Sequence, residues 1–422
     1  MHLTRQTYNT EQTRDQIETE MSVIVIVGAG QAGATLAQTL RSEGYEGQVT
    51  LIGAESDPPY ERPPLSKAYL MGEMARERLY LRPEAIYAEK NITLRLGAPV
   101  THVDTTARKL TVGGETIGWE QLALTTGSVP NRLPARIGGD LLGVFTVRSL
   151  ADIDRMQPLF ARNARVLVVG GGYIGLEAAA VAAKLGLRVV LVEMAERILG
   201  RVAAAETADV IREAHRSHGV DVREGIGLET LLGDDGRVTG ARLTDGTELD
   251  VDFVIVGTGI RPDTRLAEEA GIVCDNGIVV DELGRTSASD VWAAGDCAVF
   301  PYKGGMLRLE SVQNAIDQAR AVAANMLGAG TPYMPYPWFW SDQYDLKLQI
   351  AGLNVGYDRI VVRKTGDAVS HWYFKGDEFL AVDAVNAPRD YMVGKRLLEM
   401  GKSADPAVIA DPDAQLKALL RS

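Results

Sequence analysis

The stretch VIVIVGAGQAGATLAQTL, residues 23–40, decides the fold, because it joins an apolar run to a glycine motif and a run of small residues. In this motif Gly28 permits a tight turn, Gly30 lets a pyrophosphate approach the backbone, and Gly33 lets a helix pack closely on the strand. The phosphate would lie at the positive end of that helix. The stretch therefore predicts a strand, a turn and a helix that together bind a dinucleotide.

A second copy of the pattern is RVLVVGGGYIGLEAAAVAAKLG, residues 165–186, in which Gly170, Gly172 and Gly175 repeat the spacing. Either glycine motif alone could be only a tight strand-to-helix turn. Both copies, however, have the apolar strand before and the helix after that the motif requires. We expect an α/β protein with two Rossmann-like domains, each binding one dinucleotide.

An acidic residue at the end of the next strand chooses the coenzyme. In the second copy the run VVLVE ends at Glu193, which suits a ribose 2′-hydroxyl and repels a 2′-phosphate. This predicts NADH rather than NADPH, although Arg197 lies nearby. In the first copy Gly53 stands at that place and Glu55 follows slightly later. Glu55 is therefore either a ribose ligand or a carboxylate on a surface loop.

The length, net charge and apolar runs of the chain narrow the class of protein. With 422 residues the chain is too long for one hydrophobic core, so two or three domains are expected. A net charge of −12 argues against a general nucleic-acid binder. No apolar run reaches the ~20 residues that a membrane span needs. The polar residues 1–20 are expected to be a disordered leader, not a secretory signal.

The cysteines limit the chemistry. The chain has only Cys274 and Cys297, without a C-x-x-C pair, so neither a metal site nor a dithiol redox centre is predicted. Residues 55–81, which follow the first glycine motif, contain no cysteine. We interpret Cys297 as a small buried residue rather than a nucleophile. Two unpaired cysteines fit a reducing cytoplasm.

Five further motifs carry a resemblance to a known family. In their order and spacing they resemble the two-dinucleotide flavoproteins related to glutathione reductase. More narrowly, they are similar to the oxygenase-coupled, putidaredoxin-reductase-like ferredoxin reductases. The motifs are RPPLSKAYL (62–70), LTTG (124–127), VGTGIRPD (256–263), VWAAGDCA (291–298) and RLESVQNAIDQA (308–319).

The resemblance implies a domain order. FAD would bind the first glycine motif, in a domain made of residues 21–130 and 261–331. NADH would bind the second, in a domain of residues 131–260 inserted between those two parts. Residues 332–422 would form a C-terminal α+β interface domain, because their short alternating runs predict an antiparallel sheet. A last helix is expected over 391–400.

The resemblance also implies catalytic residues. Lys67 and Glu177 would meet beside the flavin edge that accepts hydride, where a positive charge stabilises the anionic reduced ring. Taken without the family, they could be two solvated surface charges. Tyr173 would cover the flavin until the nicotinamide displaces it, or it could be only a packing residue.

Further cofactor contacts follow from the same motifs. Asp296, which we expect to begin a helix-like stretch, would accept hydrogen bonds from the flavin ribityl chain, unless it is only a helix N-cap. Arg308 also lies in an FAD-contact motif, residues 308–319, and it could join Arg389, Lys395 and Arg396 in a basic docking patch. The other FAD and NADH contacts implied are Arg62, Thr126, Gly127, Gly259, Glu310 and Val312.

The stretch PWFWSDQ, residues 337–343, holds two of the five tryptophans. We expect Trp338 and Trp340 to face opposite ways along an extended segment. One would pack into the core, and Trp340 would line the flavin or the surface where a partner docks. The alternative is that both indoles are core residues of the sheet.

The function that these expectations imply is electron transfer from NADH through FAD to a [2Fe-2S] ferredoxin that serves a cytochrome P450 or another oxygenase. The enzyme would be a cytoplasmic monomer or weak homodimer. Two alternatives stay open: an NADH oxidase or quinone reductase on the same fold, and a redox interaction protein resembling apoptosis-inducing factor.

Overall fold

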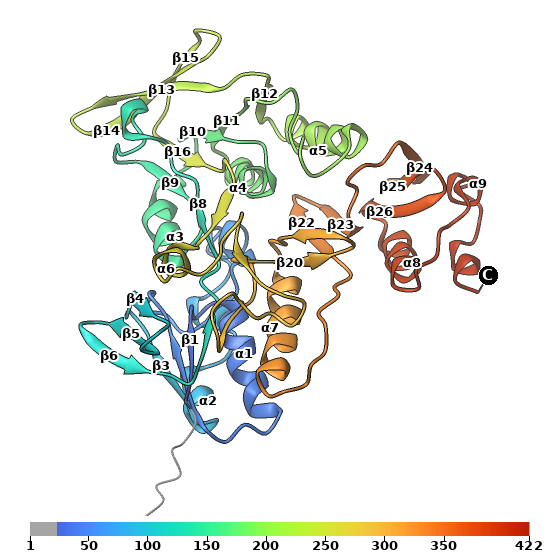
Figure 1. Ribbon diagram of the computed structural model, residues 1–422. Helices are drawn as coiled ribbons and strands as arrows, with labels where there is room; N and C mark the ends of the chain where they lie inside the picture. The colour runs from blue at the N-terminus through green and yellow to red at the C-terminus, as the bar shows by residue number, and fades with distance from the viewer. Residues whose placement is uncertain (1–22, 422) are drawn as a thin grey trace, which may run out of the picture.

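The computed structural model describes residues 23–421, so the expected leader lies outside the described residues. Its first sheet is parallel throughout, with the strand order β19-β7-β1-β2-β3. Helix α1 (Gln31–Ser42) follows β1 and packs beside α7 (Val312–Met326), a helix from a much later part of the chain (Figure 1). The strands are β1 (Val23–Val27), β2 (Gln48–Ile52), β3 (Ile92–Arg95), β7 (Gln121–Leu124) and β19 (Val291–Ala293).

The second sheet is also parallel, with the order β12-β11-β10-β16-β9. Its central strands are almost wholly apolar because both faces of the sheet are covered, one by helices and the other by the antiparallel strands of residues 228–243. The strands are β9 (Val144–Thr146), β10 (Arg165–Val169), β11 (Arg188–Glu193), β12 (Asp221–Glu224) and β16 (Phe253–Val256). The helices are α3 (Leu150–Met156), α4 (Tyr173–Lys184) and α5 (Ala205–Ser217).

Two short strands join the sheets. The chain leaves the first sheet through β8 (Ser128–Pro130) and returns through β17 (Ile260–Pro262), and these two strands pair antiparallel. After this return the chain adds β19 and α7 to the first sheet, so the second sheet is an insertion within the unit that holds the first. The α/β class with two Rossmann-like units is confirmed.

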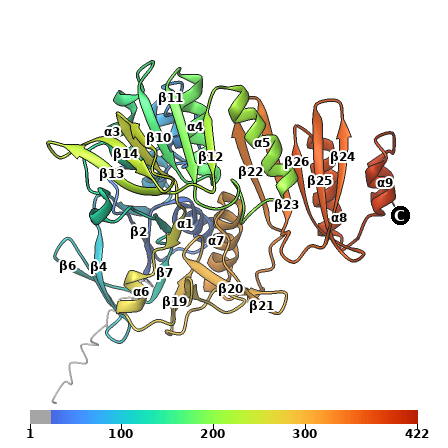
Figure 2. The same cartoon turned by 90° about the horizontal axis from the view of Figure 1, so that it is seen from above.

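The last part of the chain is an antiparallel sheet in the order β22-β23-β26-β25-β24. Helix α8 (Pro388–Glu399) packs on it and begins three residues before the predicted position 391, with a proline in its first turn. Figure 2 shows this unit beside the other two, with α5 next to β22. The strands are β22 (Trp338–Gln343), β23 (Leu346–Gly352), β24 (Arg359–Thr365), β25 (Ala368–Lys375) and β26 (Glu378–Val385).

The remaining elements form small sheets and single turns, and no helix within residues 23–421 is long and apolar enough to cross a membrane. The small-sheet strands are β4 (Val100–Asp104), β5 (Lys109–Val112), β6 (Glu115–Gly118), β13 (Leu228–Asp234), β14 (Arg237–Leu243), β15 (Glu248–Asp250), β18 (Ile278–Val279), β20 (Ala298–Tyr302) and β21 (Gly305–Leu307). The short helices are α2 (Glu84–Glu89), α6 (Arg265–Glu269), α9 (Pro406–Ala410), η1 (Pro63–Ser66), η2 (Arg76–Leu79), η3 (Ala135–Ile137), η4 (Gln157–Leu159) and η5 (Leu416–Leu420).

A buried polar cluster joins the second sheet's unit to the C-terminal sheet. Thr207 of α5 donates a hydrogen bond of 2.8 Å to Oδ2 of Asp383, and the Tyr373 hydroxyl donates to the same oxygen. The backbone N–H of Ala204 donates to the Tyr373 hydroxyl at 3.1 Å. Nδ1 of His371 lies 2.8 Å from the Thr207 hydroxyl oxygen. These contacts fix α5 on β25 and β26.

Candidate functional site

The first glycine loop shows which glycines the fold itself requires. Gly28 has a φ of +111°, and a Cβ there would lie 2.2 Å from the carbonyl oxygen of Thr125. A Cβ on Gly33 would lie 2.0 Å from the carbonyl oxygen of Gly28. At Gly30, by contrast, φ is −95° and a Cβ would meet nothing within 4 Å. The packing of the protein does not require glycine at this position, so the open space fits a ligand that approaches the backbone.

The second glycine loop repeats this arrangement. Gly170 has a φ of +106° and would place a Cβ 2.5 Å from the carbonyl oxygen of Gly257. Gly175 would place one 2.2 Å from the carbonyl oxygen of Gly170. A Cβ on Gly172 would lie 3.9 Å from its nearest neighbour, the carbonyl oxygen of Gly257, which is an ordinary contact. Each loop therefore has one glycine at a helix N-terminus that the packing of the protein does not require, which fits a dinucleotide phosphate.

Glu193 is held beside the second loop. Its Oε2 accepts from the backbone N–H of Gly171 at 2.7 Å, and its Oε1 accepts from that of Ala195 at 2.8 Å. The Arg197 guanidinium donates to the carbonyl oxygens of Ile198 and Ala203. Arg197 is thus occupied by backbone, and the carboxylate is the charge presented at the end of β11.

Glu55 is part of an ion-paired cluster. Its Oε1 lies 2.6 Å from a guanidinium nitrogen of Arg62, and its Oε2 accepts from the Tyr60 hydroxyl at 2.5 Å. Burial raises the pKa of Tyr60. Glu55 lies in the loop after β2 with its side chain 37% exposed and paired within this cluster, and its role toward a ribose stays a prediction.

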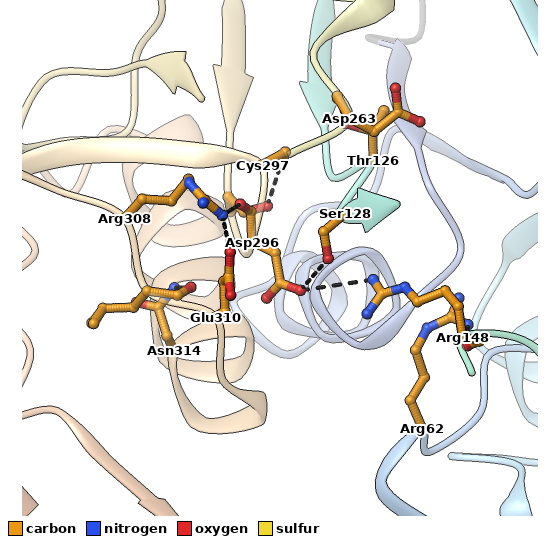
Figure 3. A network of polar contacts seen from close by, with 12 residues as sticks. Arg62, Thr126, Ser128, Arg148, Asp263, Asp296, Cys297, Arg308, Glu310 and Asn314 are labelled. Carbon is orange, nitrogen blue, oxygen red and sulfur yellow. Dashed lines mark hydrogen bonds and ion pairs between the residues drawn. The ribbon is translucent and has the colours of Figure 1, made fainter. Parts of the chain in front are cut away.

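Asp296 lies in the turn that leads into β20, where Figure 3 shows its carboxylate facing Ser128 and Arg148. Its Oδ2 accepts from the Ser128 hydroxyl at 2.9 Å and lies 3.7 Å from a guanidinium nitrogen of Arg148. The expectation that Asp296 begins a helix is wrong, because the apolar residues that follow continue as a strand.

Arg148 is a candidate ligand that sequence reasoning missed. A guanidinium nitrogen of Arg62 donates to the Arg148 carbonyl at 2.6 Å, so the two arginines are adjacent (Figure 3). Burial, and then the charge of Arg62, lower the pKa of Arg148. Neighbouring, partly buried guanidiniums are favoured by an anion between them, as a diphosphate would supply. The one signal in the sequence was an arginine just beyond strand β9.

The remaining predicted contacts lie around Asp296 and the β8–β17 crossing. The Thr126 hydroxyl donates to the Asp263 carbonyl at 2.6 Å. Glu310 accepts from Arg308 at 2.6 Å, and the Arg308 side chain is only 11% exposed, so Arg308 does not join a surface patch. Gly127 and Gly259 have positive φ, and Val312 is the first residue of α7.

Lys67 and Glu177 are brought together. Nζ of Lys67 lies 2.5 Å from Oε2 of Glu177, and the same oxygen accepts from the Ser66 hydroxyl at 2.8 Å. The side chains are 20% and 7% exposed, so these are not two solvated surface charges. Lys67 follows η1 and Glu177 lies in α4, so the pair joins the chain beyond the first loop to the helix of the second.

Tyr173, the first residue of α4, contacts Phe339 of β22 with ring centroids 4.8 Å apart. Its hydroxyl is buried and has no hydrogen-bond partner in the part of the chain that the structure describes. Burial raises the pKa of Tyr173 well above its usual value, and the nearby Asp383 adds to this. A buried hydroxyl without a partner is costly, which fits a side chain that changes position when a ligand binds.

The two tryptophans of β22 share one face of the strand, so the expectation that they face opposite ways is wrong. Residues two apart in a strand point to the same side, and the rings of Trp338 and Trp340 lie 5.5 Å apart. Trp338 packs against the C-terminal core, and Nζ of Lys395 lies 4.8 Å from its ring centroid. Phe339, which sequence reasoning missed, carries the contact to Tyr173 instead.

Both cysteines are poorly suited to nucleophilic chemistry. Cys297 is fully buried, and its Sγ donates to the carbonyls of Leu124 and Ala294. Burial raises its pKa, and burial raises the pKa of Cys274 to about 11. Within residues 23–421, no group of three or more His, Cys, Asp or Glu side chains could hold a metal ion.

Comparisons with known proteins give one consistent result. Residues 22–319 match the family model described as pyridine nucleotide-disulphide oxidoreductase, and residues 338–420 match one described as reductase C-terminal. The chain is 44% identical over 403 residues to a ferredoxin–NAD(P)(+) reductase of Sphingomonas sp., which covers 93% of this chain and 96% of the relative.

Two solved structures are similar over nearly the whole length. The structure of the covalent putidaredoxin reductase–putidaredoxin complex matches with a TM-score of 0.91 and 38% identity, covering 95% of this chain and 98% of that one. The ferredoxin reductase for the CYP199A2 system from Rhodopseudomonas palustris matches with a TM-score of 0.91 and 37% identity, covering 94% and 99%.

Proposed function

The chain belongs to the pyridine nucleotide-disulphide oxidoreductase family, and from that premise we propose that it is an FAD-dependent reductase that transfers electrons from NADH to a [2Fe-2S] ferredoxin. One observation carries the proposal. Lys67, beyond the first glycine loop, meets Glu177 in the helix of the second, in a largely buried place. Ligands that extend from the two loops would meet at this pair.

Each loop has the residues that its dinucleotide needs. FAD would bind along the first loop at Gly30, with Arg62 and Arg148 toward its diphosphate and Asp296 toward its polyol chain. NADH would bind along the second loop at Gly172, with Glu193 accepting from the ribose. When bound, FAD supplies the conversion of a two-electron hydride into single electrons.

The side chains at the meeting point would position charge and exclude water. Lys67 would place its ammonium where negative charge develops during hydride transfer, and Glu177 would hold that ammonium in place. Tyr173 and Phe339 would cover the site, and Tyr173 would give way when the nicotinamide enters.

The outlet for electrons is the C-terminal unit. The relatives named above support a ferredoxin as the acceptor, and the reductase of the CYP199A2 system supports a cytochrome P450 beyond it, or another oxygenase. Trp340, on the face of β22 opposite to Phe339, would border this outlet. We also propose the division into an FAD unit (21–130 and 261–331), an NADH unit (131–260) and an interface unit (332–422).

A cytoplasmic location is part of the proposal, supported by the two unpaired cysteines. Fractionation of the native host would test it, and recovery with the periplasm would contradict it.

The test is a transfer assay on the purified holoprotein. NADH should bleach the flavin absorbance, and adding a [2Fe-2S] ferredoxin should accelerate the reduction of cytochrome c. The same preparation is compared with oxygen and with a quinone as acceptors. Rapid turnover with quinone or oxygen and no gain from any ferredoxin would replace the proposal by an oxidase or quinone reductase. A long-lived NADH complex with negligible turnover would instead favour a redox interaction protein.

A further inference from the structure

A chain of hydrogen bonds runs from the Lys67–Glu177 pair into the C-terminal sheet and on to α5. The Ser341 hydroxyl of β22 donates to Oε1 of Glu177 at 2.7 Å, and Nε2 of Gln343 donates to the Ser341 hydroxyl oxygen at 3.2 Å. Oε1 of Gln343 lies 2.8 Å from Nε2 of His215, and the Tyr344 hydroxyl lies 3.0 Å from Nδ1 of His215. The chain crosses all three units of the protein.

The donor and the acceptor of each hydrogen bond in this chain follow from the chemistry of the neighbouring groups. Burial lowers the pKa of His215 to about 4, so its imidazole is neutral at ordinary pH and has one donor and one acceptor nitrogen. Since the Gln343 carbonyl can only accept, Nε2 of His215 donates to it. Nδ1 of His215 therefore accepts from Tyr344. Each hydrogen bond in the chain thus points its hydrogen toward Glu177.

This direction matters because Glu177 is buried. A buried carboxylate is stabilised by the donors that point at it, and donors arranged in series polarise one another. Oε2 of Glu177 accepts from Lys67 and Ser66, and Oε1 accepts from Ser341. Ser341 is therefore the donor that fixes the second oxygen and so the orientation of the carboxylate against Lys67.

We propose that Ser341 is a positioning residue for the Lys67–Glu177 pair, and that Gln343 and His215 hold Ser341 in its donating orientation. The C-terminal unit thus completes the hydride-transfer site as well as serving the acceptor. This inference rests on the proposed function, in that Glu177 acts beside the flavin. It is distinct from it because no step of electron export depends on Ser341.

The test is a double-mutant cycle on the FAD-loaded protein, followed by anaerobic stopped-flow reduction with NADH alone. Ser341→Ala should lower the limiting rate of flavin reduction about tenfold, the size expected for one hydrogen bond to a charged group. The dissociation constant for NADH should stay within about twofold. In a Glu177→Gln background, Ser341→Ala should have almost no further effect, because the two residues act as one unit.

A matched control is Asp342→Asn, since Asp342 lies between Ser341 and Gln343 but is exposed on the other face of β22. It should leave the rate unchanged. A second readout is the flavin midpoint potential, which Ser341→Ala should make more negative because the ammonium is held less firmly beside the ring. Gln343→Met should change rate and potential in the same direction by a smaller amount, and it serves if Ser341→Ala does not fold.

The outcomes separate the two ideas. An unchanged limiting rate in Ser341→Ala, or an equal loss with and without Glu177→Gln, would overturn the positioning role. A parent protein that NADH does not reduce at all would instead overturn the proposed function. If NADH reduces the parent protein but no ferredoxin accepts its electrons, only the assignment of the acceptor fails. The double-mutant cycle would still measure the effect of Ser341 on the rate of flavin reduction.

Discussion

Gly30 and Gly172 occupy matching places in the two glycine loops, since each is the N-cap of the helix that follows and a Cβ on either would meet no close neighbour. Neither has a positive φ, so backbone strain does not explain the glycine. The other motif glycines are required by the fold through close contacts or positive φ. The pair therefore offers a way to test each dinucleotide site with little cost to folding.

We predict that Gly30→Ala and Gly172→Ala have different effects. A methyl group at position 30 should displace the FAD phosphates, so Gly30→Ala should purify with little flavin and bind added FAD at least about tenfold more weakly. Gly172→Ala should retain FAD and raise the dissociation constant for NADH instead. Flavin content and titration of each variant measure this, and each variant is the control for the other. Loss of FAD from both would contradict the assignment of the two loops.

Lys67→Ala should slow the reduction of the flavin by NADH about a hundredfold, because it removes a preorganised charge from a site that excludes water. Anaerobic stopped-flow absorbance measures the limiting rate. The matched control is Lys184→Ala in the last turn of α4, whose side chain is 57% exposed beside Glu73. If NADH reduces the flavin of the two variants equally fast, Lys67 does not lie at the flavin edge that accepts hydride.

Glu193→Gln should weaken the preference for NADH. The amide keeps an oxygen that can accept from a backbone N–H, but it removes the charge that repels a 2′-phosphate. We expect the ratio of kcat/KM for NADPH over NADH to rise about tenfold or more. Steady-state kinetics with both coenzymes measure it. A ratio equal to that of the parent would show that Glu193 does not face the ribose.

The two tryptophans of β22 should differ in spite of sharing a face. Trp338 packs on the C-terminal core and on Lys395, so Trp338→Ala should lower the melting temperature. Trp340→Ala should retain FAD and its rate of reduction by NADH while ferredoxin-linked reduction of cytochrome c falls severalfold. Ferricyanide, a small acceptor, should be reduced at the parental rate. Loss of folding in Trp340→Ala would favour a core role for both indoles.

The buried carboxyl of Asp383 should make stability depend on pH. Burial raises its pKa from 3.8 to about 6, outweighing the hydrogen bonds from Tyr373 and Thr207. Burial also lowers the pKa of the neighbouring His371, which disfavours its charged form. Between about pH 4 and 6 the folded state binds the extra proton. Stability is therefore lost as the pH rises through this window, by up to about 3 kcal/mol.

Asp383→Asn removes this titration. The melting temperature of this variant minus that of the parent, both measured in excess FAD, should rise from pH 4 to pH 6 and stay constant above pH 6. Asp377→Asn is the control, because Asp377 is fully exposed in the β25–β26 turn. A difference that does not change with pH would show that Asp383 is ionised in the folded protein throughout this range.

What could be predicted from the sequence depended on how far apart the interacting residues are. The glycine loops and Glu193 could be predicted, because a turn, a helix N-terminus and a strand end are determined by residues that are adjacent in the sequence. The Lys67–Glu177 pair came from the family resemblance, since nothing local relates two residues so far apart in the chain. Arg148 and Phe339 were missed because only tertiary packing brings them to the site.

Two errors have local causes. Asp296 was expected to begin a helix-like stretch, but the run of buried residues that follows forms β20. The faces of Trp338 and Trp340 were assigned wrongly, although a period of two places them together. The role of Ser341 could not be predicted, because a serine in a strand has no sequence signal that names its acceptor.

The antiparallel crossing of β8 and β17 places the start and the end of the inserted unit side by side. Residues between them could therefore be exchanged as one cassette for the corresponding piece of another reductase, without changing the length of either connection. Such a chimera would take its coenzyme preference from the reductase that supplies the inserted unit. Its redox partner would be that of the protein that receives this unit. Coenzyme choice and acceptor choice could then be varied separately, provided that the contacts of Glu177 and Thr207 with the rest of the protein are kept.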